Sequence, residues 1–409
     1  MLIYELAWNI FASFLIPFTL RHERYRKRWV IDPPKNFESS IWIHALSVGE
    51  VLSCLPLVDA IKEEFSKEIV FTVTTEKGME IAEKKLKDKV SYLTFFPFDF
   101  WWSVKRFTDF TRPDFFILIE TDVWPFLLSY LSSKNIKSFL VNGRISPKSF
   151  SRYKKLRSIA KYVFSLFEVC MVQSEEERRK FIRLGIPEDK VINTGNIKFD
   201  REIESVTEKE KSYLRDIFCI KKEVVWIAGS THPGEEDVIL SVFKRIKEGF
   251  PDLILLLAPR NIERAREIFW KVKDMGFSCG LRTKDMRKKK EVYVIDTIGE
   301  LSRIYSIADL VFVGGSLVPF GGHNIIEPAS FGCPIIFGPY MFNFKEITQQ
   351  IIKSGGGILV RNEEELEKEV LKLLSDKCYR KKIGDSSYSF VQKNRGATKK
   401  VISVIKSRI

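Results

Sequence analysis

The chain has 409 residues, of which 45% are hydrophobic and 29% charged, which is the composition of an ordered globular protein. This length exceeds one ordinary hydrophobic core and predicts two domains of similar size. The net charge of +14 indicates an anionic partner such as nucleic acid, phospholipid or a phosphorylated substrate, although lysine-rich surfaces also occur without one.

The first twenty residues, MLIYELAWNIFASFLIPFTL, are apolar apart from Glu5 and a few small polar groups. A basic cluster follows at once, made of Arg21, Arg24, Arg26, Lys27 and Arg28. Because the charges follow the apolar run, a cleaved signal peptide is disfavoured. Two interpretations remain, a single membrane span and a helix lying in the interface, with a buried terminal helix as the alternative. Both membrane interpretations place the bulk of the chain at the cytoplasmic face of a membrane.

From residue 41 onward, short apolar runs alternate with amphipathic stretches. This alternation predicts βαβ units, and therefore parallel sheets with helices on both faces. In the first half the predicted strands are IWIHAL, IVFTVTT, VSYLTFF, FFILIE, SFLVNG, VCMVQS and VINTG. In the second half they are VVWIAG, LILLLAP, VYVID, LVFVGG, PIIFG and GILV. The helical patterns include EVLSCLPLVDAIKEEF, EKGMEIAEKKLK and EEERRKFIRLG.

The alternation lapses at residues 200–222, a charged stretch without a strand pattern. We therefore predict a membrane-associated segment at 1–30, a Rossmann-like domain at 31–208 and a second at 209–409. The last helical stretch, from residue 379, is expected to pack back on the first domain. Ligands of parallel sheets bind beyond the carboxyl ends of the strands, so both sets of strand ends are expected to face one central cleft.

HALSVGE carries the first candidate. Ser47 and Glu50 have the spacing of a capping box, in which Glu50 only satisfies a backbone donor. The alternative is a carboxylate held at the cleft as a general base, which the helix dipole would keep ionised at neutral pH. The pattern alone favours the cap.

FFILIETDVWP places two acids, Glu120 and Asp122, at the end of an otherwise apolar strand. Asp122 is a candidate cap for the helix that opens at Pro125. Glu120 has no such local role, and a buried carboxylate needs a cation. Lys198, in TGNIKFD, also follows a strand and is the candidate partner.

In the second domain, AGSTHPGEE offers Gly229, Ser230 and Thr231 ahead of a helix, a possible nest of free amides for a phosphate or carboxylate. Arg260 follows an apolar strand and can bind an anion in a forked geometry. DTIGEL is another turn from a strand to a helix, and it contains Gly299 and Glu300.

FVGGSLVPFGGHNIIEP is the richest turn of the second domain. It holds two Gly-Gly pairs, the first ending at Gly315, and then His323, Asn324 and Glu327. Bare amides at the helix start suit one phosphate. Glu327 either completes a capping box with Asn324 or binds the hydroxyls of a ribose. The spacing fits neither G-x-G-x-x-G nor the P-loop, which disfavours a dehydrogenase or an NTPase.

The remaining motifs argue against a metal site and against nucleic-acid binding. The six cysteines contain no C-x-x-C pair and the four histidines have no metal-ligand spacing, which predicts a reducing compartment and no metal site. RKKKE at residues 287–291 is a lone basic run without interleaved aromatic residues, so a membrane-tethered nucleic-acid binder is disfavoured and no nucleic acid is expected as a partner.

Taken together, the motifs resemble those of the 3-deoxy-D-manno-octulosonic acid (Kdo) transferases of lipopolysaccharide synthesis over essentially the whole chain. The motifs are RYRKRW, HALSVGE, ETDVWP, NGRIS, TGNIKFD, STHPGEE, GGSLVPFGGHNIIEPA and GPYMFNFK, in that order. The resemblance implies a GT-B fold and inverting transfer of Kdo from CMP-Kdo to a hydroxyl of an anionic lipid A precursor. It implies neither a metal nor another cofactor. Another GT-B transferase, which uses a UDP-sugar on a membrane lipid, is the alternative.

The resemblance also assigns roles to residues. Glu50 becomes the general base. Asp122 and Lys198 lie at the positions where the family places groups that support the transition state. Residues of three turns line the CMP site, and the basic cluster meets the acceptor and membrane. The CMP-site residues are Pro259, Arg260, Ile298, Gly299, Glu300, Asn324, Ile325, Ile326 and Glu327; Ser230, Thr231, Gly315 and His323 are added as donor-binding candidates. Two departures are visible: Asp122 replaces the glutamate of the usual ETELWP, and Asn324-Ile-Ile-Glu327 replaces NPLE.

Overall fold

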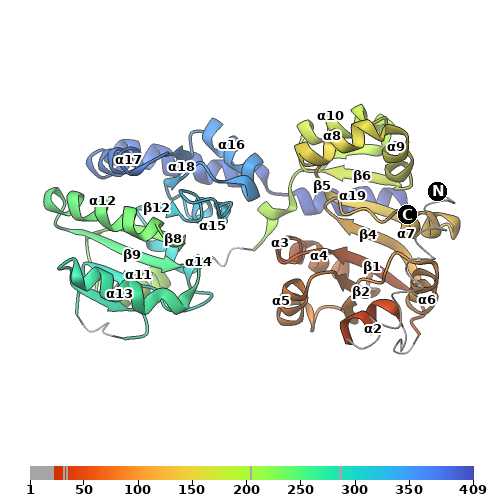
Figure 1. Ribbon diagram of the computed structural model, residues 1–409, viewed down its shortest axis with the longest axis horizontal. Helices are drawn as coiled ribbons and strands as arrows, with labels where there is room; N and C mark the ends of the chain where they lie inside the picture. The colour runs from red at the N-terminus through yellow and green to blue at the C-terminus, as the bar shows by residue number, and fades with distance from the viewer. Residues whose placement is uncertain (1–22, 31–32, 34–35, 203–204, 285–287) are drawn as a thin grey trace. The chain divides into compact units, whose positions relative to one another are not determined.

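The computed structural model describes residues 23–30, 33, 36–202, 205–284 and 288–409. These residues form two compact units. The first comprises the described residues up to Glu202 together with Asn394–Ile409, and the second comprises the rest, up to Lys393. Each unit contains one seven-stranded sheet in which every pair of neighbouring strands is parallel (Figure 1). The predicted α/β class with two parallel sheets is confirmed.

The sheet of the first unit has the order β3-β2-β1-β4-β5-β6-β7. Its strands are runs of Val, Ile, Leu and Phe that are buried on both faces, as expected for a parallel sheet between two helical layers. Ile43 of β1 pairs with Phe71 of β2 and Ile117 of β4. The strands are β1 (Ser40–Ala45), β2 (Glu68–Val73), β3 (Tyr92–Phe95), β4 (Pro113–Ile119), β5 (Lys137–Gly143), β6 (Val169–Val172) and β7 (Val191–Asn193).

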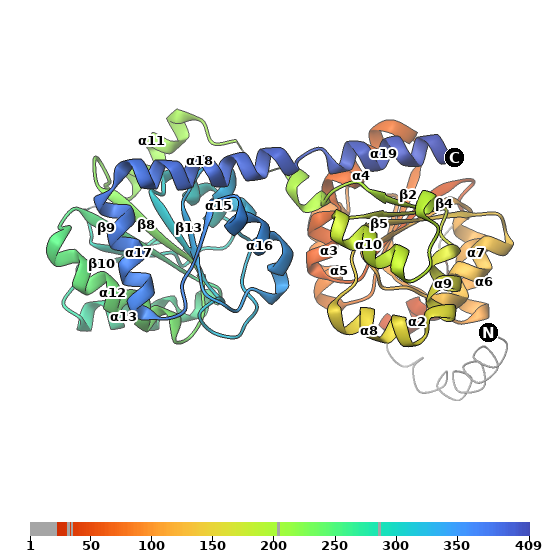
Figure 2. The ribbon, with the colours of Figure 1, turned by 90° about the horizontal axis from the view of Figure 1, so that it is seen from above.

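Two sets of helices cover the two faces of this sheet, as Figure 2 shows with α4 and α19 on one side and α2, α8 and α9 on the other. The first set encloses a core with Val58, Ile61 and Val401, and the second a core with Phe107, Leu128 and Phe164. The helices are α2 (Glu23–Trp29), α3 (Val48–Ser53), α4 (Leu55–Phe65), α5 (Glu76–Leu86), α6 (Trp101–Thr111), α7 (Pro125–Ser133), α8 (Pro147–Lys155), α9 (Arg157–Ser165), α10 (Glu175–Arg183) and α19 (Ala397–Arg408), with short 3-10 turns η1 (Glu188–Lys190) and η2 (Ile197–Asp200).

The sheet of the second unit has the order β10-β11-β9-β8-β12-β13-β14. Trp226 of the central strand β8 pairs with Leu255 of β9 and Leu310 of β12, and all three are fully buried or nearly so. The strands are β8 (Val224–Thr231), β9 (Leu253–Pro259), β10 (Cys279–Leu281), β11 (Val292–Val294), β12 (Leu310–Val313), β13 (Ile335–Phe337) and β14 (Gly357–Leu359). The sequence did not predict β10, because three residues, CGL, carry no readable strand pattern.

The helices of the second unit also pack their apolar faces on the sheet, and Ile239, Phe243 and Leu373 belong to one such core. The helices are α11 (Glu208–Ile217), α12 (Glu235–Gly249), α13 (Ala265–Asp274), α14 (Leu301–Ile304), α15 (Ile326–Ser330), α16 (Lys345–Lys353), α17 (Glu363–Ser375) and α18 (Lys377–Asn394), with 3-10 turns η3 (Ile262–Arg264), η4 (Tyr305–Ile307) and η5 (Phe342–Phe344).

The chain divides differently from the predicted 31–208 and 209–409. The first unit ends at Glu202, because α11 packs on η4 of the second unit. The C-terminal stretch is two helices, separated at Gly396, whose φ is +96°. Only the second, α19, belongs to the first unit, where Val401 and Ile405 enter the core and Asp200 accepts hydrogen bonds from the amides of Gly396 and Thr398.

The predicted apolar segment at the amino terminus lies outside the described residues. Among the residues that are described, no helix combines the length and the apolar character needed to cross a bilayer. The predicted helix at residues 50–65 is in fact two helices, α3 and α4, which meet at Cys54. Pro56 in the first turn of α4 has no N–H to continue the hydrogen bonds of α3.

Candidate active site

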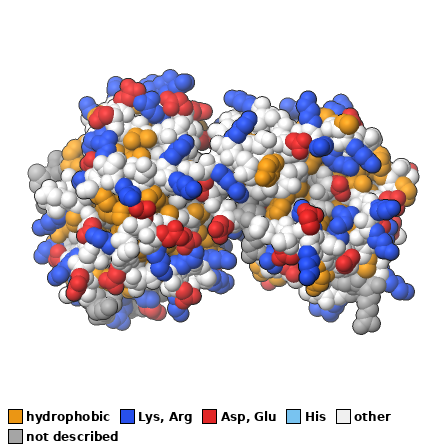
Figure 3. All heavy atoms as spheres, turned by 180° about the vertical axis from the view of Figure 1, so that it is seen from behind, with side chains coloured by type: hydrophobic (Ala, Val, Ile, Leu, Met, Phe, Trp, Pro, Cys, Tyr) orange, Lys and Arg blue, Asp and Glu red, His pale blue; other side chains and the backbone are white. Residues whose placement is uncertain are grey.

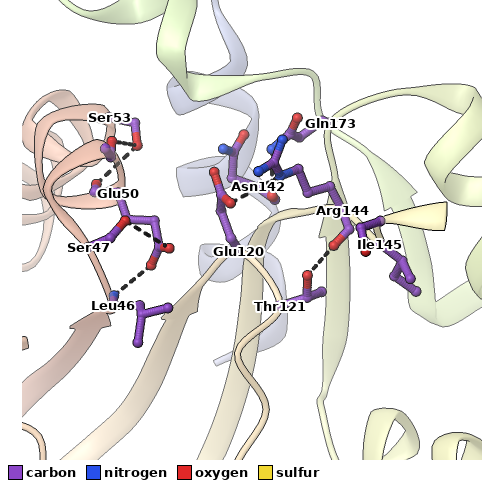
Figure 4. Close-up of polar contacts among 12 residues, drawn as sticks. Leu46, Ser47, Glu50, Ser53, Glu120, Thr121, Asn142, Arg144, Ile145 and Gln173 are labelled. Atoms are coloured by element: carbon purple, nitrogen blue, oxygen red, sulfur yellow. Dashed lines mark hydrogen bonds and ion pairs between the residues drawn. The ribbon is translucent and has the colours of Figure 1, made fainter. Parts of the chain in front are cut away.

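Glu50 lies in the first turn of α3, beyond the carboxyl end of β1, and is only 7% exposed. Its carboxylate accepts hydrogen bonds from the Leu46 amide at 2.6 Å and the Ser47 hydroxyl at 3.3 Å (Figure 4). Ser47 makes no side-chain cap of the helix, so the two residues do not form the reciprocal capping box that their spacing suggested. Glu50 thus accepts the Leu46 amide without a reciprocal cap from Ser47.

The protonation of Glu50 differs from the prediction. We expected the helix dipole to keep this carboxyl ionised at neutral pH. Burial, and then the negative charge of Glu120, instead raise its pKa to about 8. The α3 helix has only six residues, and its N-terminal field does not offset the loss of water around the side chain. At neutral pH Glu50 is thus mainly protonated.

Glu120 follows β4 and is held by two cations. Its carboxylate lies 2.9 Å from the Lys198 Nζ and 3.1 Å from the Arg144 Nε. Burial acts to raise the pKa of Glu120, but Lys198 and Arg144 together outweigh it and hold the pKa below its ordinary value. The predicted pair of Glu120 with Lys198 is confirmed. Arg144, from the NGRIS motif, is the third residue of this Glu120–Lys198–Arg144 cluster and was not predicted.

The backbone around this cluster is strained. Glu120 has a φ of +60° and Asn142, near the end of β5, also has +60°, in the left-handed region that glycine usually occupies. Both lie at the carboxyl ends of neighbouring strands, and both side chains are buried. Strain of this kind persists where the surrounding structure enforces it, most often at functional sites.

A network of side-chain amides positions Lys198. The Asn142 side chain accepts a hydrogen bond from the Ile197 amide, and the Asn196 side chain accepts one from the Lys198 amide. Gln173 joins the two, donating to the Asn142 carbonyl and accepting from the Asn196 side chain. Three motifs that are far apart in sequence therefore fix the turn η2, which presents Lys198 to Glu120.

Asp122 is not the acid that meets Lys198. Its Oδ2 is buried without a hydrogen-bond partner among the described residues, and burial raises its pKa. The buried cation near it is Arg28, whose charge acts to lower the pKa of Asp122. Asp122 also does not cap α7, because the residue at the cap position is Trp124.

The basic cluster after the apolar segment is only partly a surface. Arg21 lies outside the described residues. Arg28 is 9% exposed, its Nε donates to the Phe96 carbonyl and its guanidinium stacks 4.1 Å from the Phe98 ring centroid. Arg24 bonds to Glu76 at 2.8 Å. Of the four cations that the structure describes, only Arg26 and Lys27 are exposed. The prediction that the cluster faces a membrane is therefore wrong for Arg28, which is buried in the core.

The first Gly-Gly pair of the second unit does not offer free amides. The amides of Gly315, Ser316 and Leu317 donate to the carboxylate of Glu235, at 2.7, 2.9 and 2.9 Å. Gly314 leaves no room for a side chain, since a Cβ there would lie 2.4 Å from the Ser230 carbonyl oxygen. The amide of Gly315, one of the donor-binding candidates, is therefore occupied by an internal carboxylate. Glu235, from STHPGEE, was not among the predicted residues.

Ser230 and Thr231 also serve the structure. Thr231 is the last residue of β8, and its hydroxyl donates to Glu236 at 2.8 Å, which in turn binds Arg264 at 2.9 Å. Ser230 has a φ of +58°. The Thr231 hydroxyl is thus already committed within the unit.

His323 forms a pair with His232. Their Nε2 atoms lie 2.8 Å apart, and the His232 ring stacks on Phe320 with centroids 4.0 Å apart. Burial, with the nearby charge of Arg260, lowers the pKa of His323 to about 4. Arg260 itself is exposed, and no carboxylate in the described part of the chain pairs with it. Its charge is therefore available to an anionic ligand near two neutral imidazoles.

The Asn324–Glu327 turn is closed by its own side chains. The Asn324 Oδ1 accepts from the Ile326 amide at 3.0 Å, and its Nδ2 donates to the Glu327 carboxylate at 3.0 Å. The cap residue of α15 is Ile325, one position later than predicted. Glu327 is half-buried, with one oxygen held by Asn324.

The remaining predicted donor residues lie at the carboxyl ends of β9 and β11. Pro259 closes β9 and is buried, Ile298 is 82% exposed and Gly299 has a φ of +92°. Glu300 is paired with Arg282 at 3.0 Å and bonded to the Thr297 hydroxyl at 2.7 Å. An aliphatic side chain exposed this fully beside the Arg260 turn is a surface on which a ligand ring can pack.

In the described part of the chain, no group of three or more His, Cys, Asp or Glu side chains is arranged to hold a metal ion. The chemistry that the first unit offers comes from two carboxyls in different states. Glu50 has a raised pKa and can exchange a proton near neutral pH, while Glu120 is kept ionised by cations. Neighbouring carboxyls whose pKa values are pushed apart are typical of acid–base sites.

Comparisons with known proteins agree with this architecture. The model of the 3-Deoxy-D-manno-octulosonic-acid transferase (kdotransferase) family matches residues 21–201. The 3-deoxy-D-manno-octulosonic acid transferase of Haemophilus influenzae is 34% identical over 370 residues, covering 90% of this chain and 86% of that protein. A bifunctional glycosyltransferase/methyltransferase of Fusobacterium nucleatum is 34% identical over 363 residues, covering 88% of this chain and 56% of that longer protein.

The structure of UDP-GlcNAc 2-epimerase from Neisseria meningitidis has a TM-score of 0.64 at 14% identity, covering 90% of this chain and all of that one. At this identity the likeness shows the fold alone, the GT-B fold of two Rossmann-like domains. The sequence relationship carries the family, because more than 30% identity extends over most of both chains. The chain belongs to the family of 3-deoxy-D-manno-octulosonic acid transferases, glycosyltransferases of lipopolysaccharide biosynthesis.

Proposed function

We propose that the chain transfers Kdo from CMP-Kdo to a hydroxyl of the lipid A precursor, with inversion and without a metal, at the cytoplasmic face of the inner membrane. Membership in the Kdo transferase family supports the sugar and the pathway. The single observation that carries the mechanism is the buried Glu50 carboxyl, with a pKa raised to about 8, beside the Glu120–Lys198–Arg144 cluster.

In this proposal Glu50 accepts the proton of the acceptor hydroxyl as that oxygen attacks the anomeric carbon of Kdo. A base is most effective when its pKa lies near the working pH, which the raised pKa of Glu50 provides. The hydrogen bond from the Leu46 amide fixes the orientation of the carboxylate. Inversion follows when the base and the leaving CMP are on opposite faces of the sugar.

Lys198 and Arg144 supply positive charge for an anionic donor and a developing negative charge. Lys198 is 19% and Arg144 42% exposed, so both reach solvent while binding Glu120. Asp122 remains a candidate for transition-state support through its unpartnered, buried oxygen. Glu120, which directly binds Lys198, is the stronger candidate for the acid that positions this cation.

The second unit is proposed to bind CMP-Kdo. CMP carries a single phosphate, for which one exposed arginine, Arg260, is sufficient and no bridging metal is needed. Glu327 presents a half-buried carboxylate for the ribose hydroxyls, and Ile298 an apolar surface for the base. Pro259, Gly299, Asn324, Ile325 and Ile326 shape these turns, and His323 lies beside Arg260.

A donor comparison tests the function. The purified full-length protein is incubated with the lipid A precursor and either CMP-Kdo or a set of UDP-sugars, with and without EDTA, and the lipid products are weighed by mass spectrometry. We expect a product only with CMP-Kdo, equally with EDTA, and none with Glu50→Gln. The exposed Glu63→Gln is the matched control and should retain full activity. A product from UDP-sugars alone would refute the assignment.

A further inference from the structure

The corner between α8 and α9 exposes an unusual combination of side chains. Leu156, Ile159 and Tyr162 are 57%, 60% and 47% exposed, although they are large and apolar. They recur every three residues along the corner, whereas Ala160, Val163 and Phe164 of α9 enter the core. The α8 helix buries none of its residues.

Exposed cations lie in the same stretch of chain as these apolar side chains. The stretch 147–162 contains six Lys or Arg residues and no Asp or Glu, and all six are exposed. In the described structure none of the six pairs with a carboxylate, whereas other exposed cations do, such as Lys67, Arg245 and Lys406. The six residues are Lys148, Arg152, Lys154, Lys155, Arg157 and Lys161. On the face shown in Figure 3, by contrast, blue and red side chains are interspersed over both units.

Exposed apolar residues interspersed along the chain with unpaired cations are complementary to an anionic lipid surface. The cations interact with the headgroups, and the aliphatic and aromatic side chains gain by entering the interface. A nucleic acid would use the cations and stack on aromatic rings, but it offers nothing to an exposed leucine and isoleucine. A protein partner of this chemistry would need many acidic residues, and the six like charges disfavour a second copy of this chain.

The position of the corner is consistent with a membrane. Helices α2, α6, α7 and α9 contact one another in sequence along one face of the sheet, and Figure 2 shows α2, α8 and α9 on that side. This face also carries the exposed Arg26 and Lys27 of α2 and Trp101 of α6, which is 50% exposed. Arg144, which binds Glu120 in the active site, is three residues before Pro147, the first residue of α8.

We propose that the α8–α9 corner, with Leu156, Ile159 and Tyr162 at its tip, docks on the anionic surface of a phospholipid bilayer. It would act as a contact separate from the amino-terminal segment and bring the Glu120 cluster to the lipid acceptor. The inference deepens the proposed function by naming the surface that meets the membrane. Its test uses neither donor nor acceptor, so its failure would leave the transferase assignment untouched.

A position-specific probe on the full-length protein provides the first test. In a Cys378→Ser background, which removes the one exposed cysteine of the described chain, Ile159→Cys is labelled with an environment-sensitive NBD dye. The matched control is Trp270→Cys on α13, where the native side chain is 64% exposed. With vesicles of phosphatidylethanolamine and phosphatidylglycerol we expect a blue-shifted, brighter emission from position 159 only, and little change with phosphatidylcholine alone. Equal responses at both positions would overturn the proposal, as would no response at position 159 in protein that cosediments with the vesicles.

Charge reversal provides the second test. Lys154→Glu combined with Lys155→Glu should weaken vesicle binding roughly tenfold or more at low salt. Lys381→Glu combined with Lys382→Glu, two exposed lysines of α18, is the control and should leave binding unchanged. Equal losses in both variants would mean that only net charge matters and would refute a specific surface. If the protein self-associates without vesicles and the Lys154→Glu, Lys155→Glu variant abolishes this self-association, the corner is a protein interface. That result would also refute the proposal.

Discussion

Replacing Glu50 by glutamine should make the first unit more stable while it abolishes transfer. The folded protein holds Glu50 with a pKa raised to about 8 from an ordinary value of 4.5. Between these values the unfolded chain releases the proton and the folded chain keeps it. The contribution of this group to stability is therefore greatest below pH 4.5, falls as the pH rises, and reaches its minimum above pH 8. Glutamine mimics the protonated carboxyl and does not titrate.

The size of the effect follows from the same numbers. A pKa difference of this extent corresponds to at most about 5 kcal/mol above pH 8. Structural relaxation and solvent screening around the site reduce such penalties. We therefore expect Glu50→Gln to raise the free energy of unfolding by about 2 kcal/mol. For a unit of this size that raises the melting temperature by about 4–8 °C. The glutamine can still accept the hydrogen bond of the Leu46 amide, so little is lost in exchange.

Thermal unfolding of the wild type and Glu50→Gln is compared at pH 4 and at pH 8, with the exposed Glu63→Gln as the control. We expect no difference at pH 4, a clear gain for Glu50→Gln at pH 8 and none for Glu63→Gln at either pH. A variant that is less stable at pH 8, or equally shifted at both values, would show that Glu50 is ionised in the folded protein. The account of its raised pKa would then be wrong.

Four further outcomes are expected. The rate of transfer should rise with pH until about pH 8, because the base must lose its proton. Glu120→Gln should shift this rise in the pH–rate profile to lower pH, because it removes the charge that raises the pKa of Glu50. An unshifted pH–rate profile would exclude this coupling. Lys198→Met should lower kcat roughly a hundredfold with little change in CMP affinity, and a variant with normal kcat would show that the cation only supports the fold. Glu235→Gln should destabilise the second unit by about 3 kcal/mol in thermal unfolding, since its amide nitrogen cannot accept the backbone N–H groups now bound; an unchanged melting temperature would contradict those contacts. Glu327→Ala should weaken CMP binding about tenfold in calorimetry, or about 1.4 kcal/mol, and equal affinity would remove its role in binding the ribose.

Much of the fold was predictable because its signals are local. Near-continuous runs of Val, Ile and Phe, such as FFILIE and LILLLAP, can be buried only as central parallel strands, and both are central in the structure. The three-residue β10 at a sheet edge gave no such signal. The break between α3 and α4 had a visible cause in Pro56, but the continuous helical pattern masked it.

The candidate site was predictable in its residue types and not in its pairings. The position of polar residues directly after predicted strands pointed to Glu50, Glu120 and Lys198. The spacing of Ser47 and Glu50 suggested a capping box that the structure does not form. Arg28 appears in the sequence as one of a run of cations, yet it is buried, because the turn of α2 directs it onto Phe98.

The sequence by itself determined two parallel-sheet units, the strand ends where the chemistry lies and the family to which the chain belongs, since these depend on neighbours along the chain. Tertiary structure alone decided which groups meet. Lys198 reaches Glu120 across 78 residues and Glu235 occupies the amides of the Gly315 turn across 80. The pKa of Glu50 was decided in the same way, because burial and the charge of another strand act through space, and no pattern along the chain reports how much water a folded side chain retains.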